Sequence, residues 1–156
     1  MYQDEPLINT KTLTNAYQWF QKNKKVHVDD SNENHTVYSV SAKNLPIISI
    51  PKINSYQKKI KNCDWKDFED YVKCTTSLWQ IRIPREATLE NAKWKYGSCT
   101  CPDFAKHHVC KHLIGLAFRT KLCVIPLIAK NIPIGEKRKR GRPSKATKSF
   151  ERQPKN

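Results

Sequence analysis

Three cysteines and a histidine fall in two close pairs in the second half of the chain. Cys99 and Cys101 form a C-x-C pair, Cys110 and His112 form a C-x-H pair, and eight residues separate the two pairs. Thiolate sulfur and imidazole nitrogen are the ligands that structural zinc prefers, and four of them complete its tetrahedral coordination. The spacing therefore predicts a zinc ion held by these four residues. With four protein ligands the site would be closed to water, which indicates a structural rather than a catalytic zinc.

Two further histidines, His107 and His108, lie between the two pairs. Either of them could replace His112 as the fourth ligand, with a changed geometry. The two-residue spacing of the C-x-H pair matches that of the C-x-C pair, and this favours His112. We then expect His107 and His108 to be exposed or to support the ligands through hydrogen bonds.

Length, composition and charge limit the classes of partner. The chain has 156 residues, of which 38% are hydrophobic, and its mean hydropathy is −0.74. This gives room for one modest domain whose lean core a metal could supplement. The formal net charge of +15 favours polyanions such as nucleic acid. No stretch approaches the roughly 18 consecutive apolar residues of a membrane span, so we expect no membrane partner.

The chain contains six cysteines, and their chemical state depends on whether the protein lies in a reducing or an oxidising compartment. Residues 1–6 are acidic and lack the basic and apolar segments of a signal peptide, so we expect the thiols to be reduced. Under reducing conditions clustered thiols indicate metal binding before they indicate disulfides. We expect the three isolated cysteines, Cys63, Cys74 and Cys123, to behave as small buried hydrophobes.

Alternation and helical spacing predict the elements that position these ligands. Alternating residues predict strands at 36–40 and 78–83, extended structure at 26–28, and a further alternating stretch at 94–96. Two flanking prolines indicate a short edge strand at 47–50. Apolar spacing predicts three helices. They cover residues 14–24, capped by Thr12 or Thr14, residues 64–73, and a segment after Cys110 that includes Leu113, Leu116 and Ala117. The segments 29–34, 58–61 and 103–109 are predicted as loops or connectors.

The string Cys99-x-Cys101-Pro-x-Phe104, followed by Cys110-Lys-His112-Leu, resembles the SWIM-type zinc finger. That family occurs in Mutator-like transposases, relatives of chromatin-associated ATPases and some ubiquitin ligases. The resemblance extends over residues 78–120. It implies a β-hairpin followed by a helix, with Zn²⁺ held by Cys99, Cys101, Cys110 and His112.

These observations predict an α+β fold. It would consist of a small zinc-bound β-hairpin and helix, preceded by a region of short strands and helices and followed by a disordered basic tail. We divide the chain into an N-terminal α+β region at 1–75, the SWIM-type zinc finger at 76–125, and a linker with the basic tail at 126–156.

The last twenty residues carry nine lysines and arginines against one glutamate, which is more than half of the net charge. The core Arg140-Gly141-Arg142-Pro143 resembles an AT-hook, in which arginines enter the narrow minor groove of A·T-rich DNA. The flanking basic residues would contact phosphates. The full set of predicted DNA-binding residues is Lys137, Arg138, Lys139, Arg140, Gly141, Arg142, Pro143 and Lys145. A nuclear localisation signal and non-specific attraction to polyanions are the alternatives, and all three interpretations indicate the nucleus.

The sequence thus predicts a zinc-binding module that binds DNA with help from its tail and derives from a transposase. The alternative is a zinc-stabilised adaptor for protein partners, with Trp79 and Trp94 forming the contact surface. An enzyme is disfavoured because the chain shows no catalytic serine–histidine–aspartate pattern and no phosphate-binding loop. We expect the acidic cluster of Asp64, Asp67, Glu69 and Asp70 to be the solvated face of a helix.

Overall fold

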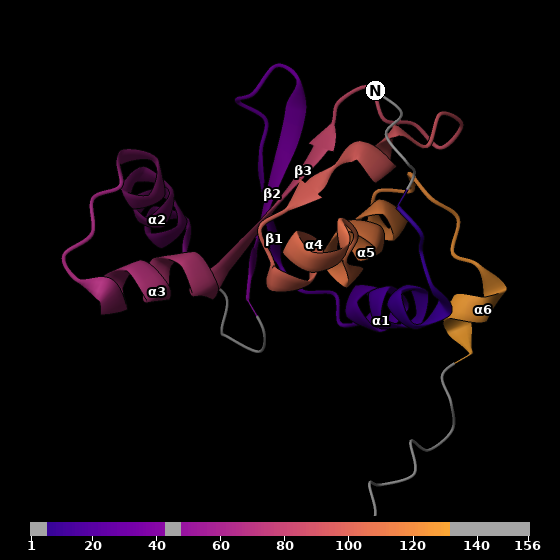
Figure 1. The fold of residues 1–156 in the computed structure, drawn as a ribbon. Coiled ribbons are helices and arrows are strands. Elements are labelled where there is room, and N and C mark those ends of the chain that lie inside the picture. The colour runs from indigo at the N-terminus through magenta and orange to yellow at the C-terminus, as the bar shows by residue number, and fades with distance from the viewer. Residues whose placement is uncertain (1–5, 43–47, 132–156) are drawn as a thin grey trace, which may run out of the picture.

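The computed structural model describes residues 6–42 and 48–131, so the predicted DNA-binding residues of the tail lie outside the described part. Eleven elements follow one another in these two ranges (Figure 1). They are α1 (Thr10–Gln21), β1 (Val26–Asp29), β2 (His35–Ser41), α2 (Ile50–Asn62), α3 (Phe68–Ser77), β3 (Leu78–Pro84), the 3₁₀ helix η1 (Lys93–Tyr96), β4 (Ser98–Cys99), α4 (Pro102–His107), α5 (Lys111–Arg119) and α6 (Leu127–Lys130).

One antiparallel sheet runs through the centre of the molecule, with the strand order β1-β2-β3-β4. Val40 of β2 lies opposite Trp79 of β3, and Ile81 of β3 lies opposite Cys99 of β4. The register therefore connects the N-terminal strands to the first predicted zinc ligand. Helices and an antiparallel sheet together confirm the predicted α+β class.

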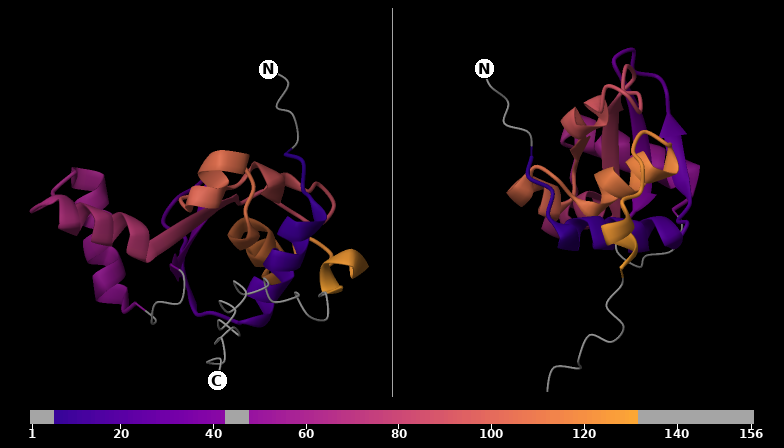
Figure 2. Two further views of the ribbon diagram at one scale, coloured as in Figure 1. Left: turned by 60° about the horizontal axis from the view of Figure 1, so that its bottom comes forward. Right: turned by 90° about the vertical axis from the view of Figure 1, so that its right-hand side faces the viewer.

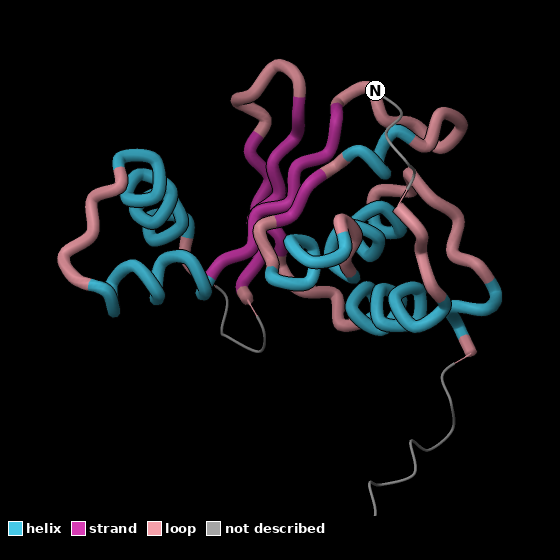
Figure 3. The backbone as a smooth tube through the Cα atoms, viewed as in Figure 1, coloured by secondary structure: helices cyan, strands magenta, loops and turns pink. Residues whose placement is uncertain are grey.

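Helices α1, α4 and α5 lie together beside the sheet (Figure 3). Trp79, Ile81 and Ile83 alternate along β3 and are all buried, so they face these helices. Helix α5 is buried along most of its length, as expected for a helix that is apolar on nearly all sides. The main core of the molecule thus lies between the sheet, α1 and α5.

The contact between α1 and α5 is close because of Gly115. A Cβ atom at this position would lie 2.5 Å from Cε3 of Trp19 and 3.0 Å from the carbonyl oxygen of Ala16. Any larger residue would therefore push the two helices apart. The absence of a side chain at Gly115 lets Trp19 pack onto the backbone of α5.

Helices α2 and α3 form an arm that projects from the rest of the fold (Figures 1 and 2). The arm connects β2 to β3, and the backbone N–H of Ala42 donates to the carbonyl of Ser77 at 2.9 Å, where the two ends of the insertion meet. The buried residues of the arm region, outside the main core, are Ile53, Tyr56, Cys74 and Leu78.

The sheet includes strands from both sides of the boundary that the sequence places between residues 75 and 76. That boundary falls inside α3, while β1 and β2 precede it and β3 and β4 follow it. Helix α1, from the first segment, also packs against α5 of the zinc finger. Within the described residues, the N-terminal region thus contributes directly to the surroundings of the predicted metal site.

Two predictions for the arm are wrong. Residues 48 and 49 are not a strand, and Ile50 begins α2 with Pro51 in its first turn. Proline is tolerated there because the first N–H groups of a helix have no partner within the helix. The predicted linker at 58–61 also belongs to α2.

Other element boundaries differ because of capping side chains. Helix α1 is capped by Asn9, whose side-chain oxygen accepts a hydrogen bond from Thr12 N at 2.8 Å. Helix α3 begins at Phe68 rather than near residue 64, because Asp67 caps it. The alternating stretch at 94–96 is part of the 3₁₀ helix η1, and the predicted connector at 103–109 contains most of α4.

The isolated cysteines differ in burial. Cys74 is fully buried, as predicted. Cys123 is half-buried, and Cys63 is exposed at the left-handed end of α2, so the prediction of a buried hydrophobe is wrong for Cys63. Across the described ranges, no helix combines the length and the apolar character that crossing a bilayer demands.

One ion pair joins α2 to α3, and its pH dependence can be predicted. Lys59 Nζ lies 2.7 Å from Asp70 Oδ2. The hydrogen bond from Lys59, followed by that from the backbone N–H of Lys66, lowers the pKa of Asp70 below 3.8. A lowered folded-state pKa stabilises the fold above pH 3.8, and this contribution is lost as the pH falls through the lowered value.

Asp70→Asn should therefore reduce the melting temperature at neutral pH, and the difference from wild type should shrink in acid. Glu69→Gln, at an exposed position in the first turn of the same helix, is the control; an equal effect of both variants would contradict the prediction.

Candidate metal centre

The predicted zinc ligands come from three successive elements. Cys99 ends β4, Cys101 is the N-cap of α4, Cys110 is the N-cap of α5, and His112 lies in the first turn of α5. The C-x-C pair thus lies at the end of a strand rather than at the turn of the hairpin, since residues 85–97 form the connection between β3 and β4. One strand and two helix N-termini converge on one point.

The four ligand atoms lie within 4.8 Å of one another. In a tetrahedron with zinc–sulfur distances of about 2.3 Å, neighbouring ligand atoms are about 3.8 Å apart, so the cluster has the size of such a site. All four side chains are buried, with exposed fractions between 1% and 7%. A buried, compact set of three thiols and one imidazole fits zinc and leaves no position for a water ligand.

The two helix N-termini are oriented to stabilise thiolates. Cys101 Sγ accepts a hydrogen bond from Phe104 N at 3.4 Å, and Cys110 Sγ accepts one from Leu113 N at 3.4 Å. Hydrogen bonds from backbone N–H groups and the positive end of a helix dipole both favour a negatively charged sulfur. Each cysteine therefore caps its helix and is prepared as a metal ligand by the same contact.

The imidazole of His112 is held between two tryptophans. The Trp19 ring meets it edge-on at a centroid distance of 5.7 Å, and the Trp79 ring lies 6.5 Å away at a tilt. The Nδ1 atom of His112 is buried without a hydrogen-bond partner within the described residues. An unsatisfied buried nitrogen is unfavourable, and coordination of a metal would satisfy it. This observation supports the fit of a zinc ion to the cluster.

The thiols influence one another strongly because they are so close. Hydrogen bonds from Cys110 and Cys99 lower the pKa of Cys101, and the hydrogen bond to Cys101 raises the pKa of Cys110 to about 12. The pKa of Cys99 is raised, chiefly by its hydrogen bonds with Cys101 and Cys110. Without metal, a second thiolate beside the first would therefore be unfavourable in this buried cluster. A divalent cation would compensate the charge of all three thiolates.

His107 and His108 are exposed, and among the described residues neither belongs to the cluster. His107 ends α4, and His108 is the left-handed C-cap of that helix, with its ring against Phe104 at 6.3 Å. The exposed positions agree with the expectation for these two residues.

Sequence reasoning missed the residues that orient the site. The tryptophans beside His112 come from α1 and β3, and the position of Cys99 and Cys101 is fixed by Thr100. Thr100 N donates to the carbonyl of Gln80 at 3.0 Å, and its hydroxyl accepts from Gln80 N at 2.9 Å. The sequence predicts the helix that carries Trp19, but not the packing of this helix against α5.

Comparison with known proteins agrees with this geometry. Residues 97–121 match the family model of the SWIM zinc finger, and all four clustered residues fall inside the match. No curated protein and no solved structure is significantly similar to the chain. The cluster is a SWIM zinc-binding site, and Zn²⁺ is the metal that it fits.

The prediction that Trp79 and Trp94 form a contact surface for protein partners is wrong. Their exposed fractions are only 6% and 3%. Trp79 packs beside His112, and Trp94 belongs to the main core. Both side chains stabilise the fold and leave little surface for a partner.

Proposed function

We propose that this chain is a zinc-stabilised DNA-binding module, in which the SWIM zinc finger organises the fold and the basic tail supplies most of the attraction to DNA. The observation that carries this proposal is the concentration of charge: residues 137–156 hold nine basic residues against one acidic residue. The Arg140-Gly141-Arg142-Pro143 segment has the residue types that suit a narrow A·T-rich minor groove. A nuclear location and descent from a transposase are part of the same proposal.

The zinc finger contributes to this function as a structural centre. Its ligands are buried, and the elements that carry them pack against α1 and β3. Zinc therefore supplies folding free energy and no reactive group, so the proposal does not include catalysis.

The tail makes a specific contribution that can be measured. Arg140→Gln combined with Arg142→Gln should weaken binding of the zinc-loaded chain to an A·T-rich duplex by about tenfold to a hundredfold at about 0.1 M salt. The preference over a G·C-rich duplex should also disappear. Fluorescence anisotropy titrations at several salt concentrations measure both effects. Lys58→Gln combined with Lys61→Gln, on exposed positions of α2, removes the same charge and is the control. Unchanged binding by the arginine variant would contradict the role of the tail.

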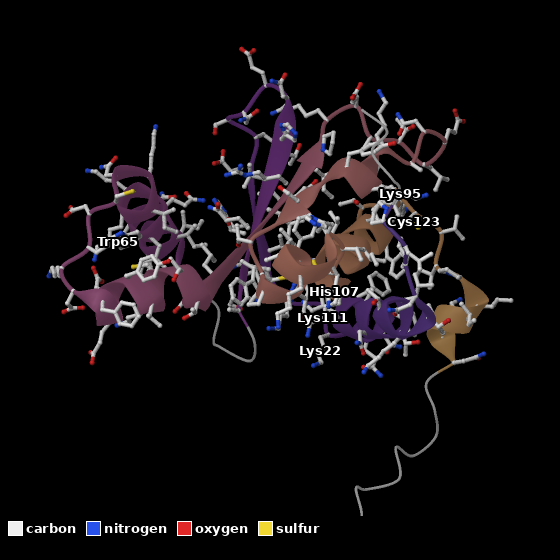
Figure 4. All side chains as sticks on the ribbon, in the orientation of Figure 1. Lys22, Trp65, Lys95, His107, Lys111 and Cys123 are labelled. Carbon is white, nitrogen blue, oxygen red and sulfur yellow. The ribbon has the colours of Figure 1, made fainter. Side chains whose placement is uncertain are left out.

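A second candidate function is that of a protein adaptor, and the arm favours it. Phe68 and Tyr71 are exposed to 76% and 43%, and the rings of Trp65 and Phe68 lie 5.3 and 6.1 Å from that of Tyr71. Figure 4 shows Trp65 on the arm, away from the zinc finger. Exposed aromatic clusters are typical of protein interfaces. Partner capture that survives high salt and removal of residues 137–156, but not Phe68→Ala, would support this function instead.

A further inference from the structure

A cavity of about 340 Å³ lies directly beside the zinc centre. Its walls come from the end of α1, the start of β3 and the first turns of α4 and α5, and they include the zinc ligands Cys101 and His112. Trp19 and Trp79, which hold His112, also line it. The cavity is therefore shaped by the same residues that fix the metal site.

Three lysines surround this cavity. Lys22 and Lys24 follow α1, and Lys111 is the first residue of α5. Figure 4 shows Lys22 and Lys111 near each other at one end of α1, although 89 positions separate them in the sequence. The pKa of Lys24 is lowered by its burial and then by the positive charges of Lys22 and Lys111. Three ammonium groups that repel one another form a natural binding site for an anion.

The position of Lys24 is fixed by two further contacts. Its carbonyl accepts a hydrogen bond from the Arg119 guanidinium at the end of α5, and its ammonium group lies 3.5 Å from the carbonyl of Ser41. The segment after α1 is thus tied to both α5 and β2. A preorganised group of charges binds a ligand with less loss of conformational entropy than mobile surface lysines do.

The residues around the cavity carry charges of both signs, and lysines are the more numerous. A zinc ion with three thiolates and a neutral imidazole carries one net negative charge, and Asp103 on the rim adds a second. Lys22 and Lys111 add two positive charges at the cavity to that of Lys24, whose ammonium group also contacts the carbonyl of Ser41. A phosphodiester of a nucleic-acid backbone carries a single negative charge, and the cavity is within the size range of ligand sites.

We propose that this cavity binds one backbone phosphodiester of DNA, held by Lys22 and Lys111, with the charge of Lys24 adding to the attraction. The inference rests on the proposed function and adds a second contact point, separate from the tail. Helix α6 packs against α1 and ends at Lys130, next to the last described residue, Asn131. The cavity lies at the end of α1, so both the cavity and Asn131 lie close to α1. A polyanion with repeated phosphates could therefore reach both. The net charge of +15 favours such a polyanion over a single acidic side chain of a protein.

The test uses the full zinc-loaded chain and a short labelled A·T-rich duplex. Lys22→Gln combined with Lys111→Gln should weaken binding by about tenfold or more at about 0.1 M salt and reduce the slope of log Kd against log salt by one or more. Lys22→Gln alone, at an exposed position that is not adjacent to a ligand in the sequence, should give part of the effect if the double variant loses zinc. Zinc content and circular dichroism show that each variant is folded.

The control is Lys58→Gln with Lys61→Gln, which removes two positive charges from the arm. If the cavity variants bind like this control while wild type binds DNA, the cavity proposal is wrong and the proposed function stands. If wild type shows no salt-sensitive binding to DNA, both proposals fail. A polyglutamate peptide that displaces the duplex provides a further test. If Lys22→Gln weakens binding of this peptide but not binding of DNA, the cavity binds an acidic protein and the phosphodiester proposal is wrong.

Discussion

Cys110→Ser is expected to abolish stoichiometric zinc binding and to unfold the region around α4 and α5. Zinc contributes roughly 10–16 kcal/mol of apparent binding free energy in isolated finger peptides, which is as large as the total stability of a typical domain. Cys110 is both a ligand candidate and the N-cap of α5, so its replacement also weakens the start of the helix that carries His112. Because α5 packs against α1 in the main core, loss of the centre should spread beyond the finger.

Metal analysis and circular dichroism of the purified variant measure these losses, and treatment of wild type with a chelator should reproduce them. Cys63→Ser makes the same chemical change at an exposed cysteine outside the cluster and should leave one zinc per chain. Full zinc content in the Cys110 variant would rule out the ligand assignment. In that case His107 and His108 would have to be reconsidered as ligands of a different set.

Trp19→Ala is expected to lower the free energy of unfolding by about 3–5 kcal/mol, as for other buried tryptophans. The side chain is 7% exposed, packs onto the backbone of α5 at Gly115, and lies against the imidazole of His112. Its removal would leave a cavity between two helices and release one side of a metal ligand. The variant should therefore also lose zinc at a lower chelator concentration than wild type does.

Denaturant unfolding and a chelator titration measure the two effects separately. Trp65→Ala, on the arm, is the matched control and should cost about 1 kcal/mol or less, with no change in zinc retention. Equal zinc retention in Trp19→Ala and wild type would show that the tryptophan supports the helix packing but not the metal ligand.

The zinc cluster could be predicted from the sequence because the relevant information is local. The four ligands form two pairs, and each pair has a spacing of two residues. Only eight residues separate the pairs, so a short segment of chain can bring all four ligands to one ion without contacts to distant segments. The strands at 35–41 and 78–84 could also be predicted, because apolar and polar residues alternate along them, as in a strand with one buried face.

The surroundings of the cluster could not be predicted, because they depend on contacts between distant segments. Trp19 and His112 are 93 positions apart, and only the packing of α1 on α5 brings them together. The same packing brings Lys22 beside Lys111. Within the arm, the prolines misled the prediction because proline suits both an edge strand and the first turn of a helix. The choice between these two depends on the residues buried against the neighbouring helix.

The arm has a consequence for how this fold can vary. Its two ends meet at the hydrogen bond between Ala42 and Ser77, at the point where neighbouring antiparallel strands end. A tight turn could join these strands equally well, since antiparallel neighbours need only a short connection. The arm is therefore a module that could be shortened, exchanged or deleted while the sheet and the zinc centre remain intact. The surface of the arm and the metal-binding site can then change independently in this chain.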